Sequence, residues 1–479
     1  MRRHRNTKIV ATLGPASSTH DQIENLFLNG ADVFRLNFSH GTHADHKARI
    51  DIIRAIEKKH NHPITILADM QGPKLRIGKF SKEFIEVTKG QKFTLYQSEE
   101  LGDEHRVSLP HPELYAVLTT GTELLLDDGK VRLKVLVNKN DIIETEVVIG
   151  GRLSNHKGLN VPGVKLPIPI LTEKDIEDME FALQHGADII ALSFVQTPED
   201  VIKAKKLIGG RAKVGSKIEK PSAIDHLEEI INQSDAIMVA RGDLGVEMPP
   251  EEVPSLQKRI NRLCRYAGKP VIVATQMLES MITNATPTRA EATDVANAVY
   301  EGADAVMLSA ESASGEFPNE SVQMMGRIIS QVESDSYYRM ILNANRNRPD
   351  PTAADAITMA ANQVSRTISA KAIVTFTTSG STTIRASRER PEVPILAITS
   401  SPATARFLNL AWGVHSVLSK ELVDFFHISE ETSKLVVEKE FAVKGDFVVI
   451  TAGLPNTRES NSNIFVSGST NLVEIIQVE

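Results

Sequence analysis

Three segments of the chain repeat one pattern, and this repeat limits the fold more than any other feature. Each segment is a helix-like stretch, then Gly-Ala-Asp, then a short apolar strand that ends in polar residues; the triplets begin at Gly30, Gly186 and Gly302. Glycine suits the left-handed conformation that ends a helix. Capping-box patterns at 172–175 and 288–291 mark the starts of helices. Repeated helix–strand units of this kind are typical of folds with a parallel sheet.

Further apolar runs extend this pattern over the first two thirds of the chain. They are mostly separated by helical lengths, as buried parallel strands are. Together they predict eight strands, at 9–13, 33–38, 64–68, 189–194, 214–218, 236–240, 271–275 and 305–308. Eight such units predict an α/β protein built on a (β/α)₈ TIM barrel, whose chemistry lies at the carboxyl ends of the strands.

Residues 73–169 do not follow the barrel pattern. Asp127-Asp128-Gly129-Lys130 is typical of a hairpin turn, and alternating runs flank it and continue at 142–149. We therefore expect a small β-barrel domain inserted in one loop, with the catalytic barrel formed by residues 1–72 and 170–335. An insertion over the catalytic mouth would serve as a lid.

Residues 336–479 form a separate α/β pattern after a linker-like stretch at 345–349. We expect a helix at 356–368 and strands at 372–376, 395–399 and 447–451. A small, hydroxyl-rich loop follows the first of these strands and opens a helix: Thr377, Thr378, Ser379, Gly380, Ser381 and Thr382. Such a loop suits a phosphate; a plain capped loop is the alternative. The segment is predicted to be a C-terminal effector domain.

The composition excludes several classes of function. The chain has 54 Lys and Arg against 61 Asp and Glu, a net charge of −7, so it is a poor non-specific binder of nucleic acid. No apolar run approaches the roughly 18 residues of a membrane span. The single cysteine, Cys264, excludes an intrachain disulfide and fits a reducing compartment. We expect a cytoplasmic protein without nucleic-acid or membrane partners.

The ends of the predicted barrel strands are strongly polar. Alternate residues share one face of a strand, and the polar ones here are Arg35, Asn37, Ser39, Asp69, Lys217, Glu219, Arg241, Asp243, Thr275, Ser309 and Glu311. Any one of these residues could be a helix cap or a surface ion pair. Their convergence on one rim indicates a catalytic site.

Eight segments of the chain resemble the pyruvate kinase family. They are KIVATLGPAS (8–17), RLNFSHG (35–41), QGPKLRI (71–77), SKIEK (216–220), MVARGDLGVE (238–247), ATQMLESM (274–281), PTRAEATDVANAV (287–299) and MLSAESASGEFP (307–318). The resemblance implies a barrel, an inserted β lid and a C-terminal α/β regulatory domain. It also implies transfer of the phosphoryl group of phosphoenolpyruvate to ADP, giving ATP and pyruvate, in the last step of glycolysis. A homotetramer is implied as well.

The resemblance also assigns roles to the residues that transfer and hold the phosphoryl group. Lys217 would contact this group during transfer, and Arg35 and Arg76 would clamp phosphate oxygens, since a guanidinium meets two oxygens at once. Glu219 and Asp243 are hard oxygen ligands that suit Mg²⁺, with Mn²⁺ as an alternative. The substrate carboxylate would lie against the backbone of Ala240, Arg241, Gly242 and Asp243.

The remaining roles concern the nucleotide and a proton. The nucleotide site would comprise Asn37, Phe38, Ser39, His40 and Arg76, with Lys157 from the exit of the lid. Thr275 would lie near the enolate face. Because a threonine hydroxyl is a poor acid, we expect it to act through water and the Ser309 and Glu311 end of the last strand.

One departure from the family pattern concerns K⁺. The positions that hold K⁺ in many members are occupied here by Asn37, Ser39, Asp69 and Met70. K⁺-dependent members read Asp-Thr-Lys-Gly-Pro-Glu where this chain has Asp-Met-Gln-Gly-Pro-Lys, ending in Lys74. The Lys74 ammonium replaces a carboxylate and would supply the positive charge of K⁺. We therefore predict that K⁺ is not required.

Several alternatives remain open from the residues alone. His40, His43 and His46 are spaced three apart, which is compatible with a metal site or with an ordinary loop. The stretch 455–470 departs from the Gly-rich loop of many members, so the effector could be a phosphorylated sugar, a nucleotide or nothing. Rival functions are a Mg²⁺-dependent aldolase or lyase acting on pyruvate-like acids, and a catalytically silent metabolite sensor.

Overall fold

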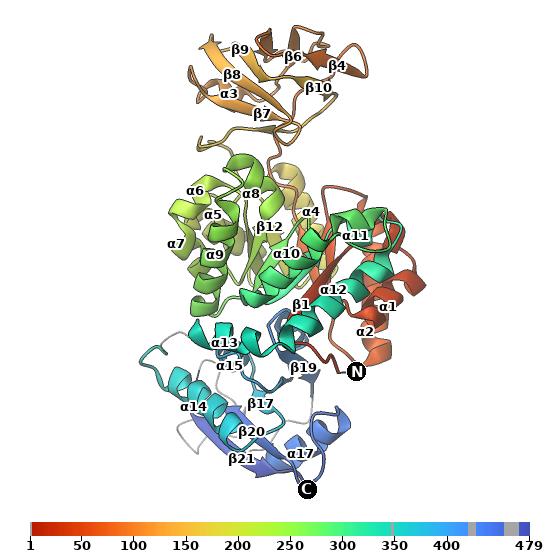
Figure 1. Cartoon of the computed structure of the whole chain (residues 1–479), viewed down its shortest axis with the longest axis vertical. Coiled ribbons are helices and arrows are strands. Elements are labelled where there is room, and N and C mark those ends of the chain that lie inside the picture. Colours follow the sequence, from red (N-terminus) through yellow and green to blue (C-terminus); the bar gives the residue numbers. More distant parts are fainter. Residues whose placement is uncertain (1, 346–348, 420–427, 455–468) are drawn as a thin grey trace.

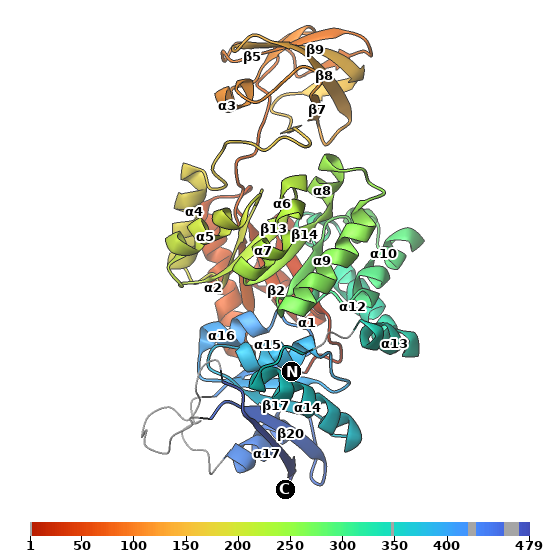
Figure 2. The same cartoon turned by 90° about the vertical axis from the view of Figure 1, so that its left-hand side faces the viewer.

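The chain forms three parts that follow one another along the long axis of the molecule (Figures 1 and 2). A β-rich insertion stands at one end, a barrel lies in the middle, and an α/β domain lies at the other end. This computed structural model describes residues 2–345, 349–419, 428–454 and 469–479. Most of 345–349 and of 455–470, for which we predicted a linker and an unusual loop, lies outside the described residues.

The central part is a closed barrel of eight parallel strands, as the repeat predicted. The ring runs in the order β1-β16-β15-β14-β13-β12-β3-β2. Its strands are β1 (Lys8–Leu13), β2 (Val33–Asn37), β3 (Thr65–Asp69), β12 (Ile189–Leu192), β13 (Lys213–Ile218), β14 (Ala236–Ala240), β15 (Val271–Ala274) and β16 (Ala305–Leu308). All eight predicted strands are confirmed, with ends that differ by at most two residues.

Helices surround the barrel and begin where the capping patterns placed them. Thr172 and Thr288 accept hydrogen bonds from the backbone N–H groups of Asp175 and Glu291, so both predicted caps are present. The longer helices are α1 (His20–Asn29), α2 (His43–His60), α4 (Glu173–Gln184), α5 (Pro198–Ile208), α7 (Leu227–Gln233), α9 (Val253–Ala267), α10 (Arg289–Tyr300) and α12 (Pro318–Glu333). After α12, helix α13 (Ser336–Ala344) places Tyr338 and Leu342 in the barrel's main hydrophobic core.

Short helices lie along the carboxyl rim of the barrel. These are η1 (Pro15–Ser17), α6 (Pro221–Asp225), α8 (Arg241–Glu247), η2 (Glu279–Ile282) and α11 (Ala310–Ala313). Each begins within a few residues of a strand end, so the chain turns immediately at the rim. This arrangement holds the polar strand ends of the sequence around one opening.

The insertion after β3 is a β domain with its own hydrophobic core. Its elements are β4 (Phe84–Val87), β5 (Lys92–Tyr96), β6 (Arg106–Ser108), α3 (Pro112–Tyr115), β7 (Glu123–Leu126), β8 (Val131–Asn138), β9 (Ile142–Ile149), β10 (Gly151–Ser154) and β11 (Leu159–Asn160). The predicted hairpin at 127–130 joins the antiparallel strands β7 and β8. Hydrogen bonds link the strands into one six-stranded and one two-stranded sheet, which wrap around the shared core.

The C-terminal part is a five-stranded sheet in the order β19-β18-β17-β20-β21. Its elements are α14 (Ala353–Thr367), β17 (Ile373–Phe376), α15 (Ser381–Arg388), β18 (Ile395–Thr399), α16 (Pro402–Leu408), β19 (Val414–Leu418), α17 (Ile428–Glu438), β20 (Phe447–Ala452) and β21 (Leu472–Gln477). The predicted helix and three strands are present. Strands β19 and β21 were not predicted. The domain boundaries at 72, 169 and 335 stay a prediction.

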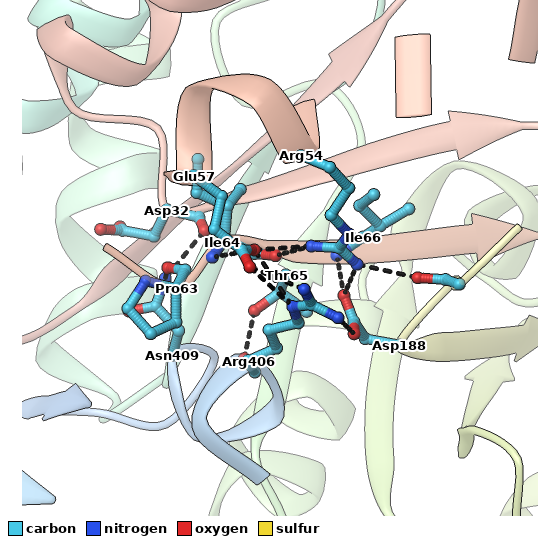
Figure 3. Close-up of polar contacts among 11 residues, drawn as sticks. Asp32, Arg54, Glu57, Pro63, Ile64, Thr65, Ile66, Asp188, Arg406 and Asn409 are labelled. Carbon is cyan, nitrogen blue, oxygen red and sulfur yellow. Dashed lines mark hydrogen bonds and ion pairs between the residues drawn. The ribbon is translucent and has the colours of Figure 1, made fainter. Parts of the chain in front are cut away.

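A polar network joins the amino rim of the barrel to the C-terminal domain (Figure 3). Asp188 accepts hydrogen bonds from the backbone N–H of Ile66 at 2.8 Å and from Arg54 at 2.7 Å. Arg406, on α16, contacts Asp188 at 3.8 Å and forms an ion pair with Glu57 of α2 at 2.7 Å. The Arg406 side chain therefore links α16 to two parts of the barrel, through Glu57 and through Asp188.

The other two aspartates of the Gly-Ala-Asp repeats also accept a backbone N–H from a neighbouring strand. Asp32 accepts from the N–H of Ile9 at 2.8 Å, and Asp304 accepts from the N–H of Val271 at 3.0 Å. Asp304 also forms an ion pair with Arg390 of the C-terminal domain at 2.9 Å. Each repeat aspartate therefore ties the start of its strand to a neighbouring strand.

Within the described residues, no helix is both long and apolar enough to cross a membrane.

Candidate active site

The carboxyl rim brings together predicted residues of three strands around Lys217, whose side chain is 12% exposed. Lys217, near the end of β13, lies 2.8 Å from Glu219 and 3.3 Å from Asp69 at the end of β3. Arg35 of β2 forms an ion pair with the other oxygen of Asp69 at 2.6 Å. Arg35 and Asp69 lie close together because β2 and β3 pair directly and their carboxyl ends are side by side. The convergence predicted from the sequence is present for these residues.

The charges in this group stabilise one another. Burial by itself disfavours the charged form of Lys217, but Asp69 and Glu219 outweigh it and raise the pKa of this lysine. Burial would also raise the pKa of Asp69, yet Lys217 and Arg35 lower it below its ordinary value. Lys217 therefore stays protonated, as an ammonium, at neutral pH. A fixed positive charge in a water-poor site stabilises anionic groups more strongly than it would in water.

Glu219 and Asp243 are the predicted pair of metal ligands, and this role stays a prediction. Burial raises the pKa of Glu219, and the negative charge of Asp243 raises it further against the effect of Lys217. Asp243 lies on α8, which follows β14, the strand next to β13. Two carboxylates close enough to repel one another fit a divalent cation. No cluster of three or more His, Cys, Asp or Glu side chains that could hold a metal ion occurs in the described ranges.

Ser193 and Phe194, at the end of β12, belong to this group and were missed by the sequence analysis. The Ser193 hydroxyl accepts a hydrogen bond from Lys217 at 2.9 Å and donates one to the carbonyl of Met70 at 2.7 Å. The N–H of Phe194 donates to Glu219 at 2.8 Å. A signal existed, because Ser193 ends a predicted strand in the same way as the residues that were chosen.

The backbone at Phe194 is strained and closely packed. Phe194 has a φ of 57°, which non-glycine residues rarely adopt. Gly72 lies against it with a φ of 69°, and a Cβ at this glycine would stand 2.8 Å from the Phe194 ring. Only glycine meets both conditions at position 72. This close contact holds the N–H of Phe194 toward Glu219.

The turn after β15 holds the predicted proton-transfer residue. The Thr275 hydroxyl accepts from the N–H of Gly242 at 2.7 Å and donates to the carbonyl of Ala274 at 2.6 Å. The Arg241 side chain bonds the carbonyls of Ala274 and Thr275, so the predicted contact of residue 241 with substrate falls to its backbone.

Ser309 and Glu311, predicted to assist Thr275, lie on the neighbouring strand end. Glu311 is buried, which raises its pKa, and its two oxygens accept from the N–H groups of Leu278 and Ser309. Both acceptor oxygens thus organise the loops that follow β15 and β16. A relay from this carboxyl group to Thr275 would require water, as the sequence analysis expected.

The predicted nucleotide residues fall on two separate parts of the molecule. Asn37, Phe38, Ser39 and His40 form a turn at the end of β2, where the side chain of Asn37 accepts from the N–H of Ser39 at 3.1 Å. Ser39 and His40 are exposed.

Arg76 and Lys157 lie in the stem of the insertion. The Arg76 guanidinium bonds the carbonyl of His156 at 2.9 Å, and Lys157 forms an ion pair with Asp127 at 2.8 Å. Both side chains therefore bond other residues of the insertion. Figure 1 shows the insertion standing away from the barrel.

A cleft of about 950 Å³ separates the insertion from the rim. From the insertion side it is lined by Lys74, Asp128 and Lys130, and from the barrel side by residues that include Gly242 and Asp243. Its lining is mixed polar and apolar, and it includes one candidate metal ligand, Asp243. It leaves room for substrates between the two parts.

The four residues at the predicted K⁺ position lie at the ends of β2 and β3. Asp69 is engaged by Arg35 and Lys217, and the carbonyl of Met70 accepts from Ser193. Lys74 is exposed, with its side chain against Gly158. Its proposed role in place of K⁺ stays a prediction.

The three spaced histidines have structural contacts. His43 bonds Asp178 at 2.7 Å, and His46 bonds the carbonyl of His40 and stacks on Phe38. Burial lowers the pKa of His46 to about 4, so it is neutral at physiological pH. His43 and His46 lie in the first turn of α2 and only His40 lies in the preceding loop, and these contacts within the chain do not favour a metal site.

Two further predictions concern Cys264 and the effector loop. Cys264 is buried and its pKa is raised by burial, which suits a packed thiol and not a nucleophile. In the loop, the N–H of Gly380 donates to Thr377, and Thr382 bonds Thr470. Thr378 and Ser379 are exposed at the start of α15.

Comparisons with known proteins match this chain over nearly its whole length. Residues 4–322 match the pyruvate kinase barrel domain, and residues 355–476 match the pyruvate kinase alpha/beta domain. A pyruvate kinase of Methylorubrum extorquens is 52% identical over 99% of this chain and 98% of its own length. One of Agrobacterium vitis is 48% identical over 100% and 99%. A crystal structure of a pyruvate kinase from Cryptosporidium parvum has a TM-score of 0.90 at 35% identity, and covers 99% of this chain and 96% of its own.

The closed parallel barrel and its charged carboxyl rim define a (β/α)₈-barrel phosphotransferase. The matches extend this assignment to the C-terminal domain. The chain belongs to the pyruvate kinase family, and its activity is that of a pyruvate kinase.

Proposed function

We propose that the carboxyl rim transfers the phosphoryl group of phosphoenolpyruvate to ADP, with Lys217 as the group nearest to the phosphoryl oxygens. The observation that supports this most is a buried ammonium held between Asp69 and Glu219 at 3.3 and 2.8 Å. Phosphoryl transfer depends mainly on positioning and on stabilising the charge of the equatorial oxygens. Arg35, next to Lys217 at the same carboxylate, clamps the phosphate of the substrate.

Glu219 and Asp243 hold the Mg²⁺ of the proposed site, and Mn²⁺ would satisfy the same oxygen donors. The ion would neutralise charge on the substrate oxygens. The chain prepares the position by fixing Glu219 through the N–H of Phe194 and the ammonium of Lys217. The substrate carboxylate lies against the backbone of residues 240–243, which line the rim between the metal ligands and Thr275.

The nucleotide binds between the two parts of the molecule, at the turn of residues 37–40 and under the insertion. Arg76 and Lys157 belong to the stem of that insertion and approach the transferring group when the lid closes. Closure expels water, and this protects the phosphoryl group from hydrolysis. The cleft of about 950 Å³ at the rim supports an open starting state.

After transfer, the enolate of pyruvate takes a proton at carbon on the Thr275 side of the site. The Thr275 hydroxyl already accepts one hydrogen bond and donates another. We propose that it orients a water molecule, with Ser309 and Glu311 fixing the adjacent loop.

We also propose a cytoplasmic homotetramer, as the family resemblance implies, with a phosphorylated effector bound near Ser379. The exposed Thr378 and Ser379 at the start of α15 support the effector position. Replacing both by glutamate should abolish activation by a phosphorylated sugar or nucleotide in an assay of pyruvate formation. Unchanged activation would remove this assignment.

The test of the main proposal follows pyruvate formation from phosphoenolpyruvate and ADP with Mg²⁺. Lys217→Met should lower kcat by about 10³-fold, because one well-placed charge is lost from the transition state. The matched control is Lys213→Met, at the opposite end of the same strand, where the lysine lies over the ring of Phe407.

The control should keep kcat within a factor of about three. An inactive wild type would reject the proposed reaction. An active Lys217→Met would leave the reaction standing but remove the role of Lys217. Replacing phosphoenolpyruvate by an aldol donor and acceptor tests the aldolase alternative, which predicts turnover without ADP.

A further inference from the structure

The two residues that follow β15 have an unusual backbone. Thr275 has a φ of 71° and Gln276 a φ of 53°. Left-handed conformations are costly for residues other than glycine, and most of all for a β-branched residue such as threonine. Two in succession turn the chain sharply out of the barrel. The carbonyls of Ala274 and Thr275 lie at this turn.

One side chain satisfies both of these carbonyls. Arg241 donates from Nε to the oxygen of Ala274 at 3.2 Å and from Nη2 to the oxygen of Thr275 at 2.7 Å. Its Nη1 donates to Asp294 of α10 at 2.6 Å. The Arg241 side chain is 12% exposed, so its cost of burial is met by these three partners. Asp294 fixes the guanidinium, and the guanidinium fixes the strained turn.

The backbone next to Arg241 completes the hold on Thr275. Gly242 follows Arg241 in the chain, and its N–H donates to the Thr275 hydroxyl at 2.7 Å. With an acceptor and a donor partner both in place, the hydroxyl has a defined direction. The same two residues of α8 therefore set the position of the threonine backbone and the orientation of its hydroxyl.

We propose that Arg241 is a positioning residue for protonation of the enolate, with Asp294 as its anchor. This inference rests on the proposed role of Thr275. Without Arg241, the strained pair loses the donors that hold it, and the hydroxyl leaves its place beside Gly242. Phosphoryl transfer depends on Lys217 and Arg35, which lie on β13 and β2 away from this turn, and shares only the start of α8 with the proton step. The proton step should therefore fall further than transfer does.

The experiment measures the half-reactions separately. Exchange of the methyl protons of pyruvate with D₂O, in the presence of Mg²⁺ and ATP, is followed by NMR and reports the proton step. ATP formation from phosphoenolpyruvate and ADP reports phosphoryl transfer. Arg241→Met should lower the exchange rate about 100-fold, the scale of a lost acid–base contribution, and lower transfer less than tenfold. Arg241→Lys, which keeps the charge but lacks the forked donors, should lie between Arg241→Met and wild type.

Asp294→Asn loosens the anchor while leaving Arg241 in place. It should lower exchange about tenfold, and this variant decides the question if the Arg241 variants do not fold. Arg262→Met, which removes an exposed arginine from α9, is the matched control and should leave both rates unchanged. An equal fall of exchange and transfer in the Arg241 and Asp294 variants would overturn the inference. Absence of exchange in the wild type would instead count against the proposed role of Thr275.

Discussion

The two rims of the barrel contain the same kinds of residue in opposite roles. At the amino rim, Asp32, Asp188 and Asp304 each accept a backbone N–H of a neighbouring strand and pair with arginine. At the carboxyl rim, the negative charge of Asp243 acts against that of buried Glu219, and Asp243 lines the cleft. Buried acids that are each paired with arginine stabilise the fold. Two acids near one another at the edge of a cleft provide a site for a cation.

Lys217 and Lys8 show the same contrast. Lys217 has two carboxylates within 3.3 Å and a raised pKa. Lys8, at the start of β1, donates to the carbonyl of Val414 in the C-terminal domain. Burial lowers the pKa of Lys8 to about 8, since the attraction of Asp32 is opposed by Arg5 and Arg3. The positive charge of Lys217 at the carboxyl rim is therefore stabilised by its surroundings, whereas burial disfavours the positive charge of Lys8 at the amino rim.

The largest expected effect comes from neutralising Glu219 at the carboxyl rim. Glu219→Gln removes a proposed metal ligand and should lower kcat by about 10³-fold. Because burial already raises the pKa of this carboxyl group, a neutral side chain costs the fold little. The melting temperature should change by less than about 3 °C. A steady-state assay with varied Mg²⁺ and a thermal melt check both parts, and a large fall in stability would make Glu219 a scaffold residue.

Neutralising Asp32 at the amino rim should have the opposite outcome, because Arg5, Lys8 and Arg3 lower the pKa of this carboxyl group to about 2 against the effect of burial. Asp32→Asn leaves Arg5 and Arg3 with a neutral partner in a buried place, and breaking such a pair costs about 3–5 kcal/mol. The melting temperature should fall by roughly 6 °C or more, while kcat of the folded enzyme stays within a factor of about three. The control is Asp51→Asn, which breaks an exposed ion pair with Lys47. If kcat fell as strongly as in Glu219→Gln, the division between the rims would be wrong.

Much of the barrel was predictable because buried parallel strands are short apolar runs. The strands β19 and β21 were missed for the converse reason. His415 and Ser416 interrupt the apolar pattern of β19, and β21 is largely half-buried at the edge of the sheet. The insertion has short strands such as β6, which covers three residues. Local pattern is weak where burial is one-sided or the strand is short.

At the site, the sequence predicted the residue types at strand ends but not the directions of their side chains. The backbone of Arg241 was predicted to lie at the substrate, and no role was predicted for its guanidinium, which bonds Asp294 and two carbonyls at a strained turn. That turn depends on φ values at Thr275 and Gln276 that no sequence pattern signals. Phe194 was missed for the same reason, because its role is performed by its backbone N–H.

A smaller effect is expected from the titration of Lys8. Between pH 8 and its ordinary pKa of 10.5, the unfolded chain holds this proton more tightly than the folded chain does. Stability contributed by the neutral lysine is therefore gained as the pH rises through this window. From pH 7.5 to 10, the free energy of unfolding of the wild type should rise by about 2 kcal/mol relative to Lys8→Met. Urea unfolding of both proteins checks this, and parallel pH profiles would show that Lys8 is not desolvated.

The smallest expected effect concerns the monovalent cation at the carboxyl rim. The amino rim has its own arginines, and at the carboxyl rim Asp69 is paired with Arg35 and Lys217 and Glu219 with Lys217. We expect Lys74 to add one more positive charge when the lid closes. Replacing tetramethylammonium chloride by KCl at constant ionic strength should then raise the rate less than about tenfold, because one fixed ammonium carries the charge of one K⁺. Lys74→Glu should create a K⁺ requirement, whereas Lys79→Glu, at an exposed lysine further along the insertion, should not. A wild type that K⁺ activates more than tenfold would mean that the carboxyl rim, unlike the amino rim, depends on a cation from outside the chain.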